Sequence, residues 1–459
     1  MITAAAALRA QLDDIDRSLA ALESQMMSLR AQKERLLTDL DSLKYPVLTL
    51  PNEITVDIFL HFVSLMRQEY HPKLQPYYGL LILASVCQTW RAVTLSTCAL
   101  WNDGVVTCDG ICDASKLLEA CLPRAGSLPL DLSIQLPADV SSTDTIISTL
   151  ILYGSQWRRI HLSSPVMWPS TPIDRFPSSL PLLECLTLSN LRANDNSVSS
   201  LRHAPQLREL RLRNSSWAIQ FGLPFNKLTK LHLFPFSITQ LLAVLPYTLN
   251  LEYLQLAYAT EDTQVVSLSI LLPYLHTFVC EEDSSTMVLQ YLMLPALERL
   301  VLLYLSNAGV HEIQSCVARS LSTIRSVALI YLDFNAAYDL LRSLPTIRHL
   351  SLSWDWSNDD EDSFFAAMIS GSCLPALESL ACEDCRPRTA DTLFAVVSAR
   401  WRGVEGTTKL NSVSLDFAQD RESDANDHEN MFHPVLDQLY ELGRQGLNLE
   451  ITGAPDATR

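Results

Sequence analysis

One short apolar pattern returns along most of the chain and constrains its fold more than any other feature. Each copy has apolar residues at its first, fourth and sixth positions, as in Trp157, Ile160 and Leu162. The copies start between residues 157 and 410 with a mean period of about 25 residues. Their first positions are Trp157, Leu183, Leu207, Leu228, Leu251, Leu275, Leu297, Ile324, Ile347, Leu377 and Leu410. Such a period predicts stacked units that share one elongated core.

Proline marks the start of many copies. It stands two residues before the first apolar position at Pro181, Pro205, Pro273, Pro295, Pro345 and Pro375. Because proline disfavours helix before it, we expect it to end one helix and lead into extended chain. Helical patterns occupy several gaps between copies, at residues 238–245, 287–293, 311–320, 336–344, 363–369 and 392–400. Each unit is therefore predicted to be a helix, a proline turn and a short strand.

These units resemble leucine-rich repeats in period and apolar spacing. The resemblance implies a curved α/β repeat solenoid over residues 105–455. The family's asparagine, three residues after the last apolar position, is mostly replaced here, by Leu191, Ser215, Phe236, Ala259, Leu305, Leu332 and Asp355. That asparagine normally satisfies backbone groups of the turn, so its loss predicts irregular curvature.

A second organised stretch covers residues 46–104. Apolar residues at helical spacing predict short helices, one carrying Ile54 and Ile58 and another carrying Leu83 and Trp90. Pro51 suits the first turn of the first helix. A helical unit this small usually needs a partner to complete its core. The alternative is an ordinary helical subdomain that packs on its own chain.

The order of residues in this stretch resembles the F-box, through which substrate receptors dock on the Skp-type adaptor of cullin-RING ubiquitin ligases. The resemblance implies an adaptor contact made by Leu48, Leu50, Pro51, Ile54, Ile58, Phe59, Val86, Cys87, Trp90 and Trp101. Trp90 and Trp101 are the expected buried anchors. Two features depart from the family: Thr55 stands at a usual leucine position, and the segment 66–79 is longer than the usual turn.

Residues 1–45 repeat apolar side chains every seven positions. One series is Leu8, Ile15, Leu22, Leu29, Leu36 and Leu43, and the other is Leu12, Leu19, Met26, Lys33 and Leu40. The offset between them is that of a coiled coil. Good helix formers without Gly or Pro predict one continuous N-terminal helix. The stripe over residues 8–43 could pair with a second copy or pack on the same chain, and Lys33 interrupts it.

Composition excludes several classes of partner and compartment. The net charge of −17 argues against nucleic acid and against an anionic membrane surface, because both need a basic footprint. No apolar run is long enough for a membrane span. The N-terminus lacks the pattern of a secretory signal. Eleven scattered cysteines read as reduced thiols, so the sequence predicts a cytoplasmic or nuclear protein.

No motif in the chain indicates catalysis, a metal or a cofactor. Cys382 and Cys385 form a CxxC, but no second pair has zinc-site spacing, and Cys382 falls on a core position of its repeat. No Gly-rich phosphate loop or nucleophile elbow is present. The acidic stretch 416–430 is predicted to be a solvated loop. We therefore expect a non-enzyme with no metal and no cofactor.

The residue between the two apolar residues of each strand should point away from the core and line the concave face. These residues are Thr187, Arg211, His232, Gln255, Val279, Val301, Ala328, Ser351 and Ala381. Two consecutive units are basic, and the expected target site comprises Arg211, Arg213, Lys230, His232, Tyr253 and Gln255. Such a patch favours an acidic or phosphorylated segment. The alternative is a solvated face that balances nearby carboxylates.

These observations predict a non-catalytic substrate-recognition subunit of a Skp–cullin–F-box ubiquitin ligase. The F-box would bind the Skp-type adaptor, and through it a cullin-RING ligase, while the repeats would hold a target protein close to the ligase. The alternative is an interaction scaffold with a coiled coil and leucine-rich repeats, whose F-box-like segment no longer binds the adaptor. An enzyme built on the repeat fold is a third reading.

Overall fold

The chain forms two compact units, Met1–Leu100 and Trp101–Arg459. The computed structural model describes residues 2–42, 50–69, 76–107, 114–168, 176–191, 203–214, 224–260, 269–332, 334–353, 361–385, 389–417 and 429–453. The division comes before the expected boundary at residue 104. The reason is that β1 (Asp103–Val106) already pairs with the next strand of the larger unit.

The larger unit is built on one parallel sheet, which has 14 strands in the described part of the chain. These strands are β1, β2 (Leu130–Gln135), β3 (Trp157–Trp168), β4 (Cys185–Leu191), β5 (Glu209–Arg213), β6 (Lys230–Phe234), β8 (Tyr253–Ala257), β11 (Thr277–Glu281), β13 (Arg299–Leu303), β14 (Ser326–Ile330), β15 (His349–Ser353), β16 (Ser379–Cys385), β17 (Ser412–Phe417) and β18 (Asn448–Thr452). They follow one another in sequence order. Every predicted copy of the pattern contributes one strand, so the expected curved α/β solenoid is confirmed.

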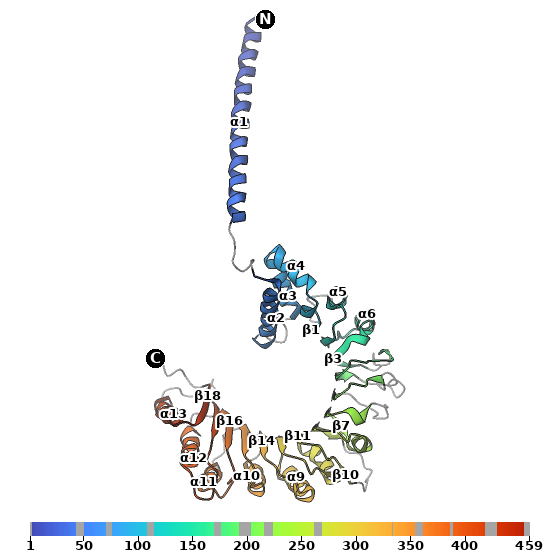
Figure 1. Ribbon diagram of the computed structural model, residues 1–459, viewed down its shortest axis with the longest axis vertical. Helices are drawn as coiled ribbons and strands as arrows, with labels where there is room; N and C mark the ends of the chain where they lie inside the picture. Colours follow the sequence, from blue (N-terminus) through green and yellow to red (C-terminus); the bar gives the residue numbers. More distant parts are fainter. Residues whose placement is uncertain are drawn as a thin grey trace. The chain divides into compact units, whose positions relative to one another are not determined.

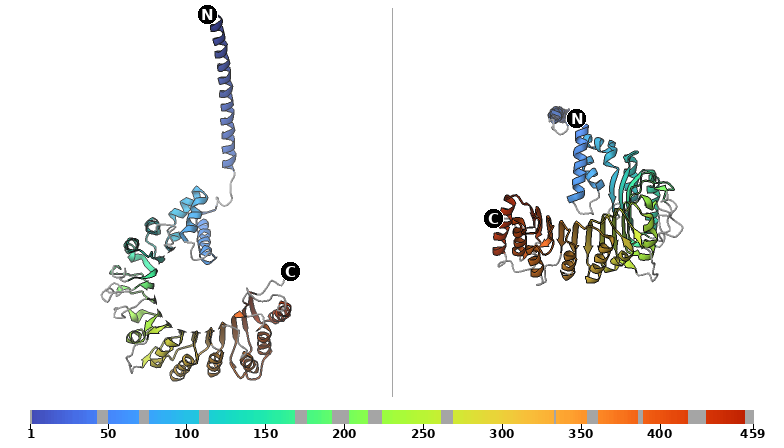
Figure 2. Two further views of the ribbon diagram at one scale, coloured as in Figure 1. Left: turned by 180° about the vertical axis from the view of Figure 1, so that it is seen from behind. Right: turned by 60° about the horizontal axis from the view of Figure 1, so that its bottom comes forward.

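Helices lie on the outer side of this sheet, and the strands line the inner side of the arc (Figure 1; Figure 2 shows the arc from behind). The helices are α5 (Ala114–Cys121), α6 (Val140–Ile151), α7 (Ile238–Val244), α8 (Asp283–Thr286), α9 (Asn307–Ser320), α10 (Phe334–Ser343), α11 (Glu361–Ser370), α12 (Ala390–Arg402) and α13 (Glu429–Arg444). The two smaller sheets pair β7 (Phe236–Ser237) with β9 (Ala259–Thr260), and β10 (Ile270–Leu271) with β12 (Leu292–Met293).

Five of the six expected helical segments are confirmed, and one prediction was wrong. Residues 287–293 do not form an α-helix. They form a 3₁₀ helix, Met287–Tyr291, followed by β12. This 3₁₀ helix follows directly on the short α8, so the apolar spacing there belongs to a tighter turn.

Proline has a more specific role than ending a helix. In each of its six copies the proline is the second residue of a turn, whose first carbonyl accepts the N–H of the residue three positions on. The donors are Leu183, Leu207, Leu275, Leu297, Ile347 and Leu377, at 3.2–3.5 Å. Proline's fixed φ suits this second position. The turn therefore places the first apolar residue of each unit at a constant point of the stack.

The core follows the predicted alternation. Leu186 and Leu188 of β4 are fully buried, whereas Thr187 between them is half-buried, and most other strands repeat this pattern. Leucine burial of this kind contributes roughly 1.5–3 kcal/mol per side chain. At the position of the missing asparagine, Phe236, Leu305 and Leu332 are buried, whereas Ser215 and Asp355 lie outside the described residues. Apolar packing thus occupies a place that the family gives to a polar ladder.

The smaller unit contains α1 (Ile2–Ser42), α2 (Asn52–Glu69), α3 (Pro76–Val86), α4 (Gln88–Ser96) and a 3₁₀ turn (Cys98–Leu100). Helices α2, α3 and α4 bury Phe59, Val63, Leu80, Leu83 and Val93. The segment 66–79 was expected to be a turn longer than the one usual in the family. Its two ends instead extend α2 and α3, and only residues 70–75 lie outside the described part.

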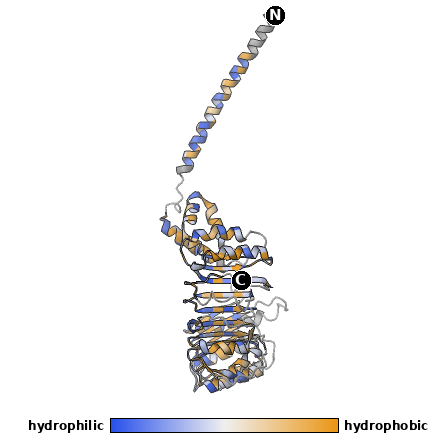
Figure 3. Ribbon diagram, turned by 90° about the vertical axis from the view of Figure 1, so that its right-hand side faces the viewer, coloured by the Kyte–Doolittle hydropathy of each residue, from blue (hydrophilic) through white to orange (hydrophobic). Residues whose placement is uncertain are grey.

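Helix α1 is continuous, as predicted, and its 41 residues span about 60 Å. Every side chain from Leu12 to Asp39 is exposed, including the apolar positions of both heptad series. The expected positions Leu8, Leu40 and Leu43 lie outside the described side chains. Figure 3 shows hydrophobic and hydrophilic residues alternating along this helix. None of the described helices is long and apolar enough to cross a membrane.

Candidate functional site

Helix α2 carries apolar side chains on two faces. Thr55, Phe59 and Val63 are spaced four apart and face inward. Ile54 and Ile58 stand one residue earlier in each turn and remain 47% and 46% exposed. Leu50, just before the helix, continues this outer stripe with 37% exposure, and Pro51 and Glu53 are exposed as well. Because residues four apart share a helix face, the outer stripe forms one apolar surface.

The remaining residues expected at the adaptor contact have different environments. Val86 is 56% exposed, whereas Cys87 and Trp90 are half-buried. The Cys87 sulfur caps α4 by accepting the N–H of Trp90 at 3.4 Å. Phe59 packs edge-on against Trp90 with ring centroids 4.9 Å apart, so it serves the core of the unit.

The two tryptophans expected as anchors differ in exposure. Trp101 is buried within the larger unit, where the guanidinium of Arg124 lies 5.3 Å from its ring. Leu48 lies outside the described residues. Thr55, the departure from the family's leucine, is 6% exposed, and its hydroxyl donates to the Pro51 carbonyl. Replacing a leucine by threonine therefore alters the inner packing of α2 and leaves the outer stripe intact.

Sequence reasoning missed several exposed apolar side chains in this unit. Leu60, Leu65, Leu81 and Leu95 are each at least 37% exposed. Leu81 falls within an unbroken apolar run in α3, so helical spacing alone could not separate its inner and outer faces. Leu65 continues the Ile54–Ile58 stripe by two turns and could have been found by extending the count along α2.

Two residues of the expected basic patch on the inner surface of the solenoid, Arg211 and His232, bond a carboxylate and an amide of the same chain. Arg211 on β5 bonds Glu209 on the same strand. His232 on β6 has its Nδ1 2.8 Å from Oε1 of Gln255 on β8. Gln255 in turn donates from Nε2 to Glu281 on β11 at 2.7 Å. We call these five residues the polar network. The alternative of a balanced polar face describes this region better than an open basic patch.

The protonation of His232 follows from its place in the network. Since the amide Oε1 can only accept, Nδ1 of His232 must carry the proton. Nε2 lies 3.5 Å from Glu209, beyond a good hydrogen bond. Burial lowers the pKa of His232 below its usual value, although the bond to Gln255 opposes that shift. The Tyr253 hydroxyl also donates to Gln255 at 3.2 Å, and Lys230 stays exposed.

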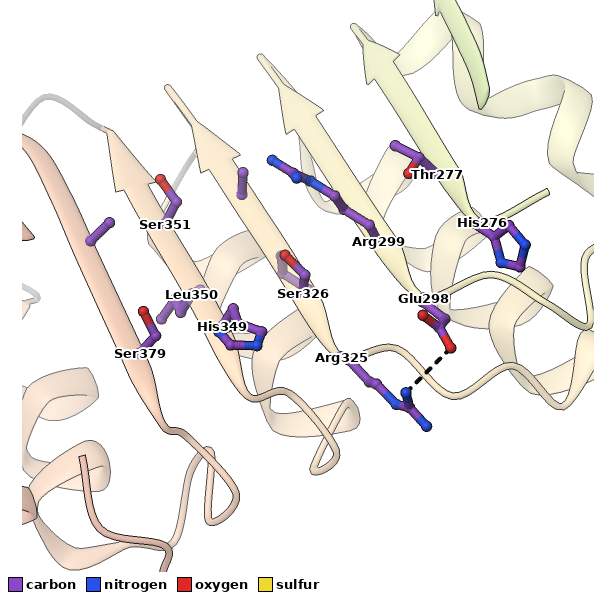
Figure 4. A pocket seen from close by; sticks show the side chains of 13 residues that line it. His276, Thr277, Glu298, Arg299, Arg325, Ser326, His349, Leu350, Ser351 and Ser379 are labelled. Carbon is purple, nitrogen blue, oxygen red and sulfur yellow. Dashed lines mark ion pairs between the residues drawn. The ribbon is translucent and has the colours of Figure 1, made fainter. Parts of the chain in front are cut away.

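A hollow of about 680 Å³ opens on the inner surface further along the solenoid, over strands β11 to β16. Its floor holds the small side chains Ala328, Ser351 and Ala381, which sequence analysis had placed on the concave face. Figure 4 shows its lining on the side of the strands away from the helices. Val279, expected on the same face, is only 5% exposed, so its neighbours cover it.

Basic side chains rim the hollow at the amino ends of the strands. Arg325 pairs with Glu298 at 3.4 Å, as the dashed line in Figure 4 marks. Arg299 projects from the start of β13, and no carboxylate of the described residues forms an ion pair with it. His276 and His349 are exposed on the same rim.

Aromatic and acidic residues line the opposite edge, at the carboxyl ends of the strands. The residue one step beyond each strand pairing holds a left-handed backbone in seven units: Asn190, Asn214, Tyr258, Glu282, Tyr304, Tyr331 and Asp384, with φ of 49–70°. Asn and Asp tolerate this region, whereas other side chains pay roughly 1–3 kcal/mol there. Tyrosine at three of these positions is therefore costly for folding, and Tyr258, Tyr304 and Tyr331 are all exposed.

The described residues contain no group of three or more metal-ligating side chains placed to hold an ion. Cys382 and Cys385 are both buried and free, and a hydrogen bond to Cys385 together with burial raises the pKa of Cys382. A buried, protonated thiol is a poor nucleophile and a poor ligand. Most of the acidic stretch 416–430 lies outside the described residues.

Comparison with known proteins found structural likeness only. No model of a protein family matches the chain, and no curated protein matches it. An internalin from Listeria monocytogenes is 14% identical with a TM-score of 0.32, over 75% of this chain and 95% of that one. A protein from Bacteroides fragilis is also 14% identical with a TM-score of 0.30, over 61% and 69%.

The protein of a TLR13–ssRNA13 complex is 15% identical with a TM-score of 0.30 and covers 63% of this chain. This chain spans only 38% of that protein's length. At such identities and scores these likenesses carry no information on what the present chain binds.

Proposed function

We propose that this chain is the substrate-recognition subunit of a Skp–cullin–F-box ubiquitin ligase. The outer stripe of α2, formed by Leu50, Ile54 and Ile58, carries the proposal. Three aliphatic side chains at helical spacing stay in water while the opposite face of the same helix completes a core. Burying these side chains against an adaptor would remove their apolar surface from water, which contributes favourable free energy to binding. The order of residues around them resembles an F-box.

The solenoid supplies the second half of the proposed role. Its inner surface presents polar and aromatic side chains on a rigid parallel sheet, a kind of scaffold suited to holding an extended partner. Nothing in the described residues supplies a catalytic constellation, and the ligase role needs none, because a receptor acts by proximity. The target is a protein segment held on this surface.

A direct titration of the purified chain with a Skp-type adaptor tests the proposal. The variant Ile54→Ala with Ile58→Ala should weaken adaptor binding at least tenfold, since two half-exposed aliphatic contacts are lost. It should keep its melting temperature, because both side chains are exposed. Val140→Ala is the matched control, since Val140 is an apolar residue of the solenoid with 61% exposure.

The outcomes separate cleanly. Phe59→Ala should instead unfold the helical unit, because Phe59 is fully buried against Trp90. Absence of binding by the unaltered chain at adaptor concentrations well above the micromolar range contradicts the ligase role. The same is true if the double variant binds as tightly as the control.

A second role, self-association through α1, is favoured by one observation. The described apolar positions of both heptad series, from Leu12 to Leu36, are all exposed. We infer that a second copy covers this stripe as a coiled coil. Lys33→Leu should raise the stability of the dimer, because a buried ammonium at this position is unfavourable. Sedimentation of the intact chain decides it, and a monomer at every accessible concentration contradicts the inference.

A further inference from the structure

We call the row formed by Tyr258, Glu282, Tyr304, Tyr331 and Asp384, at the carboxyl ends of the strands, the aromatic edge. Its arrangement is not explained by folding alone. The rings of Tyr304 and Tyr331 are stacked, with centroids 5.4 Å apart and planes 13° from parallel. Both residues hold the left-handed backbone that asparagine holds in earlier units. Asparagine at either position would relieve the backbone, so these two exposed rings are retained at a cost to stability. Costs of this kind collect at binding sites.

Carboxylates flank the stacked pair along the same row. Glu282 precedes it on the β11 side, where a hydrogen bond from Tyr258 and the negative charge of Glu282 raise the pKa of that tyrosine. Asp384 follows on the β16 side, with Oδ2 3.5 Å from the Tyr331 hydroxyl. Among the described residues no lysine or arginine forms an ion pair with Glu282 or Asp384.

An aromatic ring at the β6 end of the same row already holds a cation of the chain. At the other end of the row, Phe234 lies edge-on to Tyr258 with centroids 4.7 Å apart. The guanidinium of Arg213 sits 5.2 Å from the Phe234 ring. That end of the row is therefore already occupied by a cation from the same chain. None of the described cation–π contacts involves Tyr304 or Tyr331.

We propose that the edge formed by Tyr258, Glu282, Tyr304, Tyr331 and Asp384 binds an extended peptide segment bearing arginine or lysine. Cationic side chains lie over the exposed tyrosine rings and pair with the carboxylates on either side. The four strand steps from Glu282 to Asp384 span about 19 Å, which matches roughly six residues of extended peptide with three side chains on one face, and Tyr258 lies one strand step before them. A net charge of −17 favours approach of such a segment.

This inference deepens the proposed function, because it names the chemistry of the target segment that the solenoid would hold. It replaces the acidic or phosphorylated segment expected from the basic patch. The polar network already neutralises Arg211 internally, whereas the carboxylates at the aromatic edge have no cationic partner among the described residues.

Fluorescence anisotropy with a labelled Arg-Ser-Arg-Ser-Arg-Ser peptide at physiological salt tests the proposal on the full chain. The double variant Tyr304→Asn with Tyr331→Asn should bind the peptide about fivefold more weakly, as expected for two exposed cation–π contacts. Its melting temperature should hold or rise. Tyr274→Asn is the matched control, because Tyr274 and Tyr304 are both 56% exposed. A citrulline version of the peptide, which keeps the shape without the charge, should not bind.

A second variant keeps the test decisive if the tyrosine variant loses stability. Glu282→Gln with Asp384→Asn removes the charge with near-identical shape, and Asn suits the left-handed backbone at residue 384. It should also weaken peptide binding about fivefold. Affinity within about twofold of the unaltered chain for both double variants overturns the proposal. So does equal binding of the citrulline peptide, or no binding of the arginine peptide.

The adaptor titration distinguishes this result from the ligase role. Both double variants should bind the adaptor like the unaltered chain, because they lie in the larger unit. If the unaltered chain does not bind the adaptor, the ligase role is contradicted. The peptide-binding proposal is not affected by that outcome.

Discussion

The inner surface of the solenoid has two stretches that share a backbone and differ in what their side chains do. Over β5 to β11, Arg211 bonds Glu209 within β5, and Gln255 bonds both His232 and Glu281 across neighbouring strands. Over β13 to β16 the equivalent positions are small, and a hollow opens between a basic rim and an aromatic edge. Polar side chains of the first stretch bond one another, whereas Arg299 and Asp384 of the second have no ion-pair partner among the described residues.

This difference teaches that residue type alone does not locate a binding surface. The basic cluster in the sequence is the most conspicuous polar feature of the repeats, yet Arg211 at its centre already pairs with Glu209 of the same chain. A hydrogen bond made internally stabilises the fold, and a partner that breaks it must replace it at equal strength. A binding protein gains more free energy from polar groups that have no hydrogen-bond or ion-pair partner within the chain, because no internal bond has to be broken.

The largest expected difference between the stretches is in stability. Gln255→Leu removes the acceptor of His232 and Tyr253 and the donor to Glu281, leaving half-buried polar groups unpaired. We expect the free energy of unfolding to fall by about 1–3 kcal/mol. Ser351→Ala on the floor of the hollow should change it by less than about 0.5 kcal/mol. Urea denaturation measures both, and equal effects would remove the distinction between the stretches.

The pH dependence of stability should come largely from two histidines, His232 in the first stretch and His161 on β3 before it. Burial lowers the pKa of His232, and it also lowers the pKa of His161 on β3. The unfolded chain therefore binds these protons more tightly, so the free energy of unfolding falls as pH drops below about 6.5. Melting curves between pH 8 and pH 5 should show this fall. His232→Gln with His161→Gln should flatten it, and an unchanged slope would show that other groups dominate.

The smallest expected effect is the change in stability when the two stacked tyrosines of the second stretch are replaced. Tyr304→Asn and Tyr331→Asn relieve two left-handed backbones but lose one ring stack. The free energy of unfolding should stay constant or rise by up to about 1 kcal/mol per site. Chemical denaturation decides this, and a loss of more than about 1 kcal/mol per site would make the ring stack a structural element.

Sequence reasoning predicted the repeat well because the repeat depends on local and periodic information. Apolar spacing placed every strand of the large sheet from β3 to β17, and the prolines marked the turns that precede six of them. The inner face followed from strand alternation, with Val279 as the exception. On α2 the apolar pattern did not separate buried Phe59 from exposed Ile58, because both residues belong to it and they differ only in which helix face they occupy.

What the sequence determined by itself is the order of units, their period, and which side of each strand faces the core. These follow from the chain's own spacing of apolar residues and turn formers. The tertiary structure decided which polar residues meet, because Gln255 bonds His232 and Glu281, which are each more than 20 residues away in the sequence. It also decided that three tyrosines hold a left-handed backbone, which no side-chain pattern announces. Cross-strand contacts exist only once the units are stacked, so their pairing could not be read from any one repeat.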